Sequence, residues 1–141
     1  GRARWTPRPW SGRRRCASPT AEASNALYRG NLAVFNAGIE NYVESVAVGV
    51  SGLSGWVVNV APDLVAQVGD LVAAGDVDAA LRLQAVLVNV EQTMGATYPA
   101  SAKAIVDSRG SLGWSTTSRW RPSDIDQDLI ATLVREIEEN R

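Results

Sequence analysis

The chain has 141 residues, enough for one domain with a buried core, and its content of 45% hydrophobic and 21% charged residues is ordinary for a globular protein. The single cysteine, Cys16, excludes an internal disulfide framework and a multi-cysteine zinc site, and the absence of histidine removes histidine-based triads and histidine–metal sites. No apolar run reaches membrane-spanning length, and no apolar signal-peptide core follows the arginine-rich start. We therefore expect a cytoplasmic protein with no metal, no cofactor and no contact with a membrane.

The net charge of −1 hides an asymmetry along the chain. Residues 1–20 hold six arginines and no acid, whereas residues 21–141 hold eight basic and fifteen acidic residues, a balance of −7. An acidic body argues against a nucleic-acid-binding domain. The arginine- and proline-rich residues 1–30 stay unassigned, with three interpretations. Residues 1–20 form a phosphate-binding arm with Trp5 and Trp10 for stacking, a disordered tail, or, as residue types with G- and C-rich codons favour, the product of a truncated or frame-shifted start, and residues 21–30 are weakly helical.

The first regular elements alternate between strand and helix. Residues 32–35 are a short apolar run that predicts a strand, and residues 36–38 read as the loop that follows it. Residues 39–48 predict a helix with Ile39 and Val43 on its buried face, alongside Val46 and Ala47, and Gly49 ends it.

The stretch of residues 49–62 organises the rest of the chain. Residues 53–60 have the length and β-branched content of a buried strand of a parallel sheet, and Pro62 suits the first turn of a helix. Ligands in such folds sit at the carboxyl ends of strands. That end is residues 58–60, or Ser54 and Gly55 if the strand bends early. Gly55 marks either a close approach of a ligand or only tight packing.

The second half of the chain is predicted to be helical. Apolar stripes predict helices over residues 62–74 and from residue 77 to about residue 94, with Gly75 ending the first and Asp76 capping the second. Val77, Leu81 and Val88 widen the stripe of the second helix, so we expect it to be covered on more than one side. Pro99 opens a third helix that ends near Gly110, and residues 110–122 form a loop with Trp114 and Trp120. Ser123 caps a last helix whose first turn contains Asp124 and Asp126.

Lys103 is the only lysine of the chain. A desolvated lysine amine attacks carbonyl groups, so a lone lysine invites a Schiff-base hypothesis. The alternative, which its place inside a helix far in sequence from both strands favours, is a structural or surface lysine.

Several short groups together resemble a known family. In chain order they are Gly49-Val50-Ser51-Gly52-Leu53-Ser54-Gly55, Asn59-Val60-Ala61-Pro62, Ala74-Gly75-Asp76 with Ala79-Ala80, and Pro99 four residues before Lys103. Their order and spacing over residues 31–141 resemble the C-terminal part of the dihydrodipicolinate synthase / N-acetylneuraminate lyase family. The resemblance implies an α/β fold: a C-terminal fragment of a (β/α)8 TIM barrel, with residues 31–74 as its last two βα units and residues 75–141 as a C-terminal helical domain. A complete barrel takes about 250 residues.

The resemblance also implies a chemistry. Members of the family are pyruvate-type aldolases or lyases in which a lysine on the sixth strand forms an imine with a keto acid and a tyrosine shuttles protons; both match positions upstream of residue 31. Tyr28, Tyr42 and Tyr98 do not match the catalytic tyrosine, and Lys103 matches a lysine of the helical domain. No catalytic residue is therefore expected in this chain.

The positions that do match the substrate pocket are Gly38, Ser54 and Gly55. Residues 36–40 depart from the acidic loop of the synthase branch. This weakens the hypothesis of an enzyme of lysine biosynthesis relative to that of a sugar-acid lyase. The resemblance implies a small keto acid as the partner of the parent enzyme and a homo-oligomer, commonly a tetramer. The alternative is a non-catalytic helical interaction module whose arginine-rich arm binds an acidic partner.

Overall fold

The computed structural model describes residues 33–120 and 124–141, so the predictions for residues 1–30 and for Ser123 fall outside the described residues. The elements in chain order are β1 (Phe35–Asn36), η1 (Ile39–Asn41), α2 (Tyr42–Ala47), β2 (Gly52–Leu53), η2 (Trp56–Asn59), α3 (Pro62–Ala74), α4 (Val77–Gly95), α5 (Ala100–Gly110) and α6 (Gln127–Glu139). The described part is mostly helical with a small parallel sheet.

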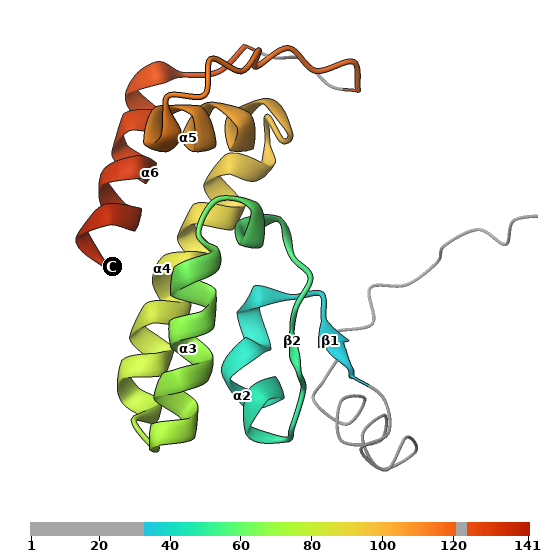
Figure 1. Cartoon of the computed structure of the whole chain (residues 1–141), viewed down its shortest axis with the longest axis vertical. Helices are drawn as coiled ribbons and strands as arrows, with labels where there is room; N and C mark the ends of the chain where they lie inside the picture. The colour runs from blue at the N-terminus through green and yellow to red at the C-terminus, as the bar shows by residue number, and fades with distance from the viewer. Residues whose placement is uncertain (1–32, 121–123) are drawn as a thin grey trace, which may run out of the picture.

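β1 and β2 form a parallel pair connected through η1 and α2 (Figure 1). Phe35 pairs with Gly52, and a side chain at position 52 would come within 2.9 Å of the Phe35 ring, so glycine there leaves room for the ring in its present place. The described strand, Phe35–Asn36, is shorter than the predicted strand 32–35 and ends one residue later, and residue 32 lies outside the described residues. The predicted βα alternation is present.

The predicted helix over residues 39–48 is split into η1 and α2. Ile39 and Val43 are buried as predicted, but Ala47 is exposed and Tyr42 and Ser45 are buried in addition. Gly49, at φ 92°, ends the helix.

The prediction of a strand over residues 53–60 is wrong. The strand ends at Leu53, and after Gly55 the backbone enters the 3₁₀ helix η2. Val57 and Val60 are both buried, at 0% and 1% exposure, and their spacing of three matches the 3₁₀ period. A short apolar run of this length fits several buried conformations equally well, so its pattern could not exclude the 3₁₀ turn.

The predicted bounds of α3 are confirmed. Pro62 occupies its first turn, Leu64, Val65 and Val68 are buried, and Gly75 ends it in the left-handed region at φ 82°.

The N-cap prediction for α4 is also confirmed, because the Asp76 side chain accepts a hydrogen bond of 3.1 Å from the Ala79 N–H. The predicted wider apolar face of α4 is wrong at two positions, since Val77 and Leu81 are 47% and 42% exposed. No described element covers that side of the first two turns.

α5 begins directly after Pro99 and ends at Gly110, as predicted, with Ala102 and Ile105 buried. Residues 111–120 form neither helix nor strand. α6 begins later than predicted: Asp126 is its N-cap, and its carboxylate accepts hydrogen bonds from the Asp128 and Leu129 N–H groups.

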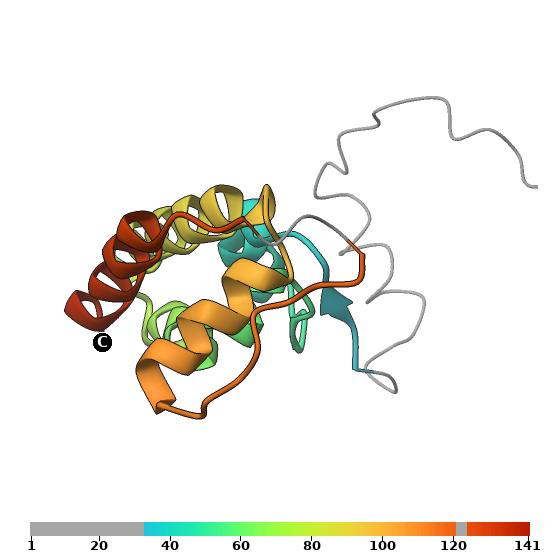
Figure 2. The same ribbon diagram turned by 90° about the horizontal axis from the view of Figure 1, so that it is seen from above.

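The hydrophobic core lies between the helices rather than under the sheet. α3 and α4 run side by side, α2 lies between them and the strands, and α5 and α6 pack against each other at the far end of α4 (Figures 1 and 2). The largest fully buried apolar side chains are Ile39, Leu64, Leu87, Met94, Ile105, Leu133 and Ile137. Within residues 33–120 and 124–141, none of the helices has the length and apolar content needed to cross a membrane.

Candidate functional site

The carboxyl ends of the two strands meet at one edge. The Ser54 N–H donates a hydrogen bond of 2.7 Å to the Asn36 carbonyl, which extends the β1–β2 pairing by one step. A side chain at Gly55 would begin 3.6 Å from the Ala37 carbonyl, so the loops after the two strands are in contact. The structure thus brings Gly38, Ser54 and Gly55 to the edge at which α/β sheets bind ligands.

Asn36 fixes the first of these loops. Its amide Nδ2 donates to Asn41 Oδ1 at 2.8 Å and to Ser45 Oγ at 2.7 Å, and its Oδ1 accepts from the Gly38 N–H at 3.1 Å. The backbone N–H of Gly38 is therefore already paired, and Gly38 contributes space rather than a hydrogen-bond donor. The sequence had indicated Asn36 only as part of a loop; the signal for its role was the group of short polar side chains at positions 36, 41 and 45.

Glu91 approaches the second loop from α4. Its Oε2 accepts a hydrogen bond of 2.7 Å from the Val57 N–H and would lie 3.1 Å from a side-chain carbon at Gly55. Burial raises the pKa of the Glu91 carboxyl, and the negative charge of Glu40 adds to this, although the hydrogen bond from Val57 opposes it. A half-buried carboxylate from the helical part therefore caps η2 beside the predicted substrate residues. Nothing in the local sequence distinguishes Glu91 from a solvated helix residue.

Lys103 lies elsewhere. Its Nζ donates a hydrogen bond of 3.0 Å to the Thr117 carbonyl, and its side chain lines a cavity with Tyr98 and Trp114. Tyr42 is buried, and burial raises the pKa of its hydroxyl. Tyr28 lies outside the described residues.

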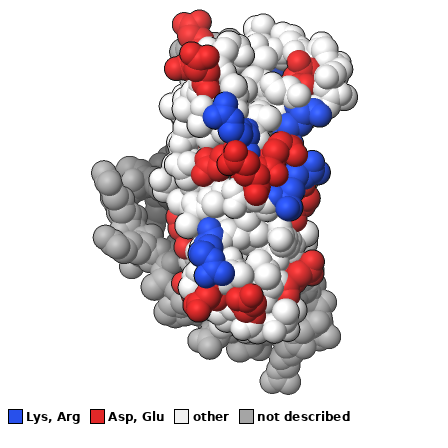
Figure 3. Space-filling view, turned by 90° about the vertical axis from the view of Figure 1, so that its left-hand side faces the viewer, with Lys and Arg blue, Asp and Glu red and all other residues white. Residues whose placement is uncertain are grey.

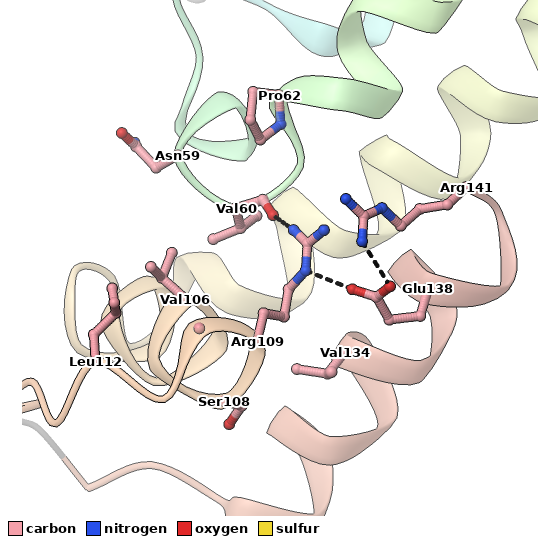
Figure 4. A pocket seen from close by; sticks show the side chains of 11 residues that line it. Asn59, Val60, Pro62, Val106, Ser108, Arg109, Leu112, Val134, Glu138 and Arg141 are labelled. Carbon is pink, nitrogen blue, oxygen red and sulfur yellow. Dashed lines mark hydrogen bonds and ion pairs between the residues drawn. The ribbon is translucent and has the colours of Figure 1, made fainter.

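A larger cavity, of about 580 Å³, lies where the start of α3 meets α5 and α6 (Figure 4). Arg109 points between the Val60 carbonyl, to which it donates a hydrogen bond, and Glu138, whose Oε1 is 2.6 Å from its Nε. Arg141 bridges Glu138, at 3.0 Å, and Asp63, at 2.6 Å. Acidic and basic side chains are also interleaved over this side of the molecule in Figure 3.

These ion pairs lower the pKa values of both acids, Asp63 and Glu138. A hydrogen bond from Arg141 makes the largest contribution to lowering the pKa of Glu138, and a hydrogen bond from Arg109 makes the second largest. At Asp63, burial alone would raise the pKa, but the hydrogen bond and charge of Arg141 combine with backbone hydrogen bonds to lower it. Because both arginines of the cavity are paired with carboxylates, we interpret this cluster as a joint between α3, α5 and α6 rather than as an anion site.

Metal ligands do not gather in the described part of the chain. Among residues 33–120 and 124–141, no three histidine, cysteine, aspartate or glutamate side chains are grouped in a way that could hold a metal ion.

The described residues form a small parallel sheet connected and followed by helices, and this arrangement was compared with known proteins. No family model matches the sequence, and no curated protein matches it. Two solved structures share the fold: the sialic acid aldolase of Ruminococcus gnavus, as wild type and as a catalytic lysine mutant.

The likeness is one of fold alone. Both structures align with a TM-score of 0.77 at 17% identity, over 88% of this chain for the wild type and 89% for the mutant. In each case the aligned part is 43% of the aldolase chain, so this chain spans less than half the length of these enzymes. Its fold matches part of a TIM-barrel aldolase.

Proposed function

We propose that the chain is the C-terminal portion of a Schiff-base keto-acid aldolase or lyase of the dihydrodipicolinate synthase / N-acetylneuraminate lyase type. The observation that carries the proposal is the alignment of 88% of the chain with a sialic acid aldolase. The short sequence groups between residues 49 and 103 resemble the same type of enzyme, and that resemblance does not depend on the structure. In this proposal the chain supplies two βα units and the helical domain, while the imine-forming lysine and the proton-shuttling tyrosine belong to the preceding part of the barrel.

The role of the strand-end residues follows from their lack of bulk. Gly38 and Gly55 lie on adjacent loops, and side chains there would approach Glu40 and Glu91 within 3.1 Å. In the complete barrel these positions and Ser54 would form the wall of the keto-acid pocket on the side of the last two strands. The departure of residues 36–40 from an acidic loop favours a sugar-acid lyase over a synthase.

A two-stranded parallel sheet is not stable by itself, which also supports the proposal. β1 and β2 are each two residues long, and Phe35 on β1 is 59% exposed. Further strands beside them would cover this apolar side chain and satisfy the strand edges.

A chimera tests the proposal directly. Residues 33–141 would replace only that segment of the Ruminococcus gnavus aldolase with which they align. The product would be treated with pyruvate and borohydride, which reduces a lysine imine to a stable adduct. We expect mass spectrometry to find the adduct at the catalytic lysine of the aldolase part. A folded chimera that forms no adduct, while the intact aldolase does, would count against the proposal and favour the alternative of a helical interaction module.

The unmodified chain provides the matching control. With pyruvate and borohydride, we expect no adduct on Lys103, because its amine is held by a carbonyl of the 111–120 loop rather than placed at the strand ends. An adduct mapped to Lys103 would overturn both the residue assignment and the view that the catalytic lysine lies outside this chain.

A further inference from the structure

A second cavity adjoins the larger one, with which it shares Asn59 and Val106, and is bordered on another side by Trp114 of the 111–120 loop. Its volume is about 310 Å³, at the lower end of the range for small-molecule pockets. The residues that line it come from η2, from α5 with the two residues before it, and from the loop: Asn59, Tyr98, Pro99, Ala102, Lys103, Val106 and Trp114. One of them is a cation, two are aromatic and none is acidic.

The cation of this cavity has no acidic partner among residues 33–120 and 124–141. The Lys103 ammonium carries three donors, of which one is bonded to the Thr117 carbonyl at 3.0 Å, and within the described residues it takes part in no ion pair. Arg109 and Arg141, in the larger cavity, differ because Asp63 and Glu138 neutralise them. Lys103 can therefore accept a carboxylate without first breaking a salt bridge.

The Tyr98 ring and the backbone of Trp114 are held in place by neighbouring residues. The Tyr98 ring stacks on Trp56 with centroids 4.5 Å apart and planes 5° from parallel, and Asn59 Nδ2 donates to the Tyr98 hydroxyl at 3.3 Å. The backbone N–H of Trp114 donates to Asp107 Oδ1 at 2.9 Å, which ties the loop to α5. The Trp114 side chain nevertheless remains 54% exposed, and a flat apolar ligand would cover it.

We propose that this cavity binds a small aromatic monocarboxylate, with the carboxylate on Lys103 Nζ and the ring against Trp114 and Tyr98. The positive charge of Lys103 favours an anionic ligand. A cationic ligand would be repelled by Lys103, and the lining has no acidic residue to offset that repulsion. The aromatic side chains of Tyr98 and Trp114 favour a ligand with a planar ring. This site is distinct from the strand-end residues Gly38, Ser54 and Gly55, and the inference does not depend on the aldolase proposal.

The test uses the full chain and three probes of one shape: phenylacetate, 2-phenylethanol and phenethylamine. Binding is followed by isothermal titration and by tryptophan fluorescence. We expect phenylacetate to bind at least about tenfold more tightly than the alcohol, since a charge-assisted hydrogen bond is lost in the latter, and the amine to bind most weakly. Raising the salt concentration should weaken phenylacetate binding and leave the alcohol unchanged.

Variants test whether Lys103 causes the preference for phenylacetate over 2-phenylethanol. Lys103→Gln should abolish the preference for the acid, Lys103→Arg should retain it, and Arg135→Gln, at an exposed position on α6, should leave it unchanged. Equal binding of acid and alcohol, no binding of any probe, or an unchanged preference in Lys103→Gln would overturn the proposal. The comparison of the three probes on the unaltered chain decides the question even if Lys103→Gln loses helix content.

Discussion

Replacement of Glu91 by alanine tests whether a residue of the helical part holds the backbone beside the strand ends. Glu91 Oε2 is the acceptor of the Val57 N–H at 2.7 Å, and Val57 is fully buried at 0% exposure. In Glu91→Ala this N–H, which belongs to a buried residue, loses its acceptor. Leaving a buried donor unsatisfied costs about 1–3 kcal/mol, which corresponds to a roughly 5- to 160-fold increase in local opening.

The assay is amide hydrogen exchange, read residue by residue by NMR. We expect the Val57 amide and its neighbours in η2 to exchange faster by that factor in Glu91→Ala, while amides in the middle of α3 change little. Glu91→Gln keeps an acceptor at the same place, so the exchange of the Val57 amide should increase less than in Glu91→Ala. Gln92→Ala, an exposed change on the same helix, is the matched control. If Val57 exchanges at the same rate in Glu91→Ala and in Gln92→Ala, the capping argument is refuted.

The Glu91 variants also predict a pH dependence. Because burial raises the folded-state pKa of Glu91 above its unfolded value, its contribution to stability is present below the unfolded pKa and is lost as the pH rises through the folded pKa. Glu91→Gln should remove this loss, so the variant should show a smaller decline in its urea midpoint across that interval. A decline equal to that of the unaltered chain would show that Glu91 is not the group responsible.

Three further predictions concern other parts of the chain. Arg141→Met should flatten the acid dependence of the urea midpoint relative to Arg135→Met, because the lowered pKa values of Asp63 and Glu138 stabilise the fold above their unfolded pKa values and this stabilisation is lost as the pH falls through the folded ones; equal profiles would contradict it. Asp76→Ala removes the N-cap of α4 and should cost about 1 kcal/mol in thermal unfolding, where no change would exclude the cap as a stabilising contact. Deletion of residues 1–20 should leave the helix content unchanged by circular dichroism, since their sequence has no periodic apolar face, and loss of the fold would show the segment to be structural.

Local signals in the sequence were sufficient for the helices of the second half. Pro62 at the start of α3, Gly75 in the left-handed region at its end and Asp76 as the cap of α4 act on residues within four positions of themselves. Such signals can be read without knowing the rest of the fold. The contact between the loop after β1 and Gly55 after β2 could also be predicted, because adjacent parallel strands place their carboxyl ends at the same edge.

The tertiary structure decided what the local pattern left open. Residues 56–59 became a 3₁₀ helix rather than a strand, with the N–H of Val57 capped by Glu91, which is 34 positions away in the chain. Val77 and Leu81 belong to an apolar pattern yet stay exposed, because no described element packs on that side of α4.

The polar contacts around the cavities also join residues that are distant in the sequence. The Asn59–Tyr98 hydrogen bond spans 39 positions, and the Arg141–Asp63 pair spans 78. The sequence by itself determined the helices, their caps and the parallel βα unit, since these depend on backbone propensities and on periods of a few residues. The tertiary structure decided where the short strand ends and which polar side chains meet, because those choices depend on the burial and hydrogen bonding of groups that are distant in the chain.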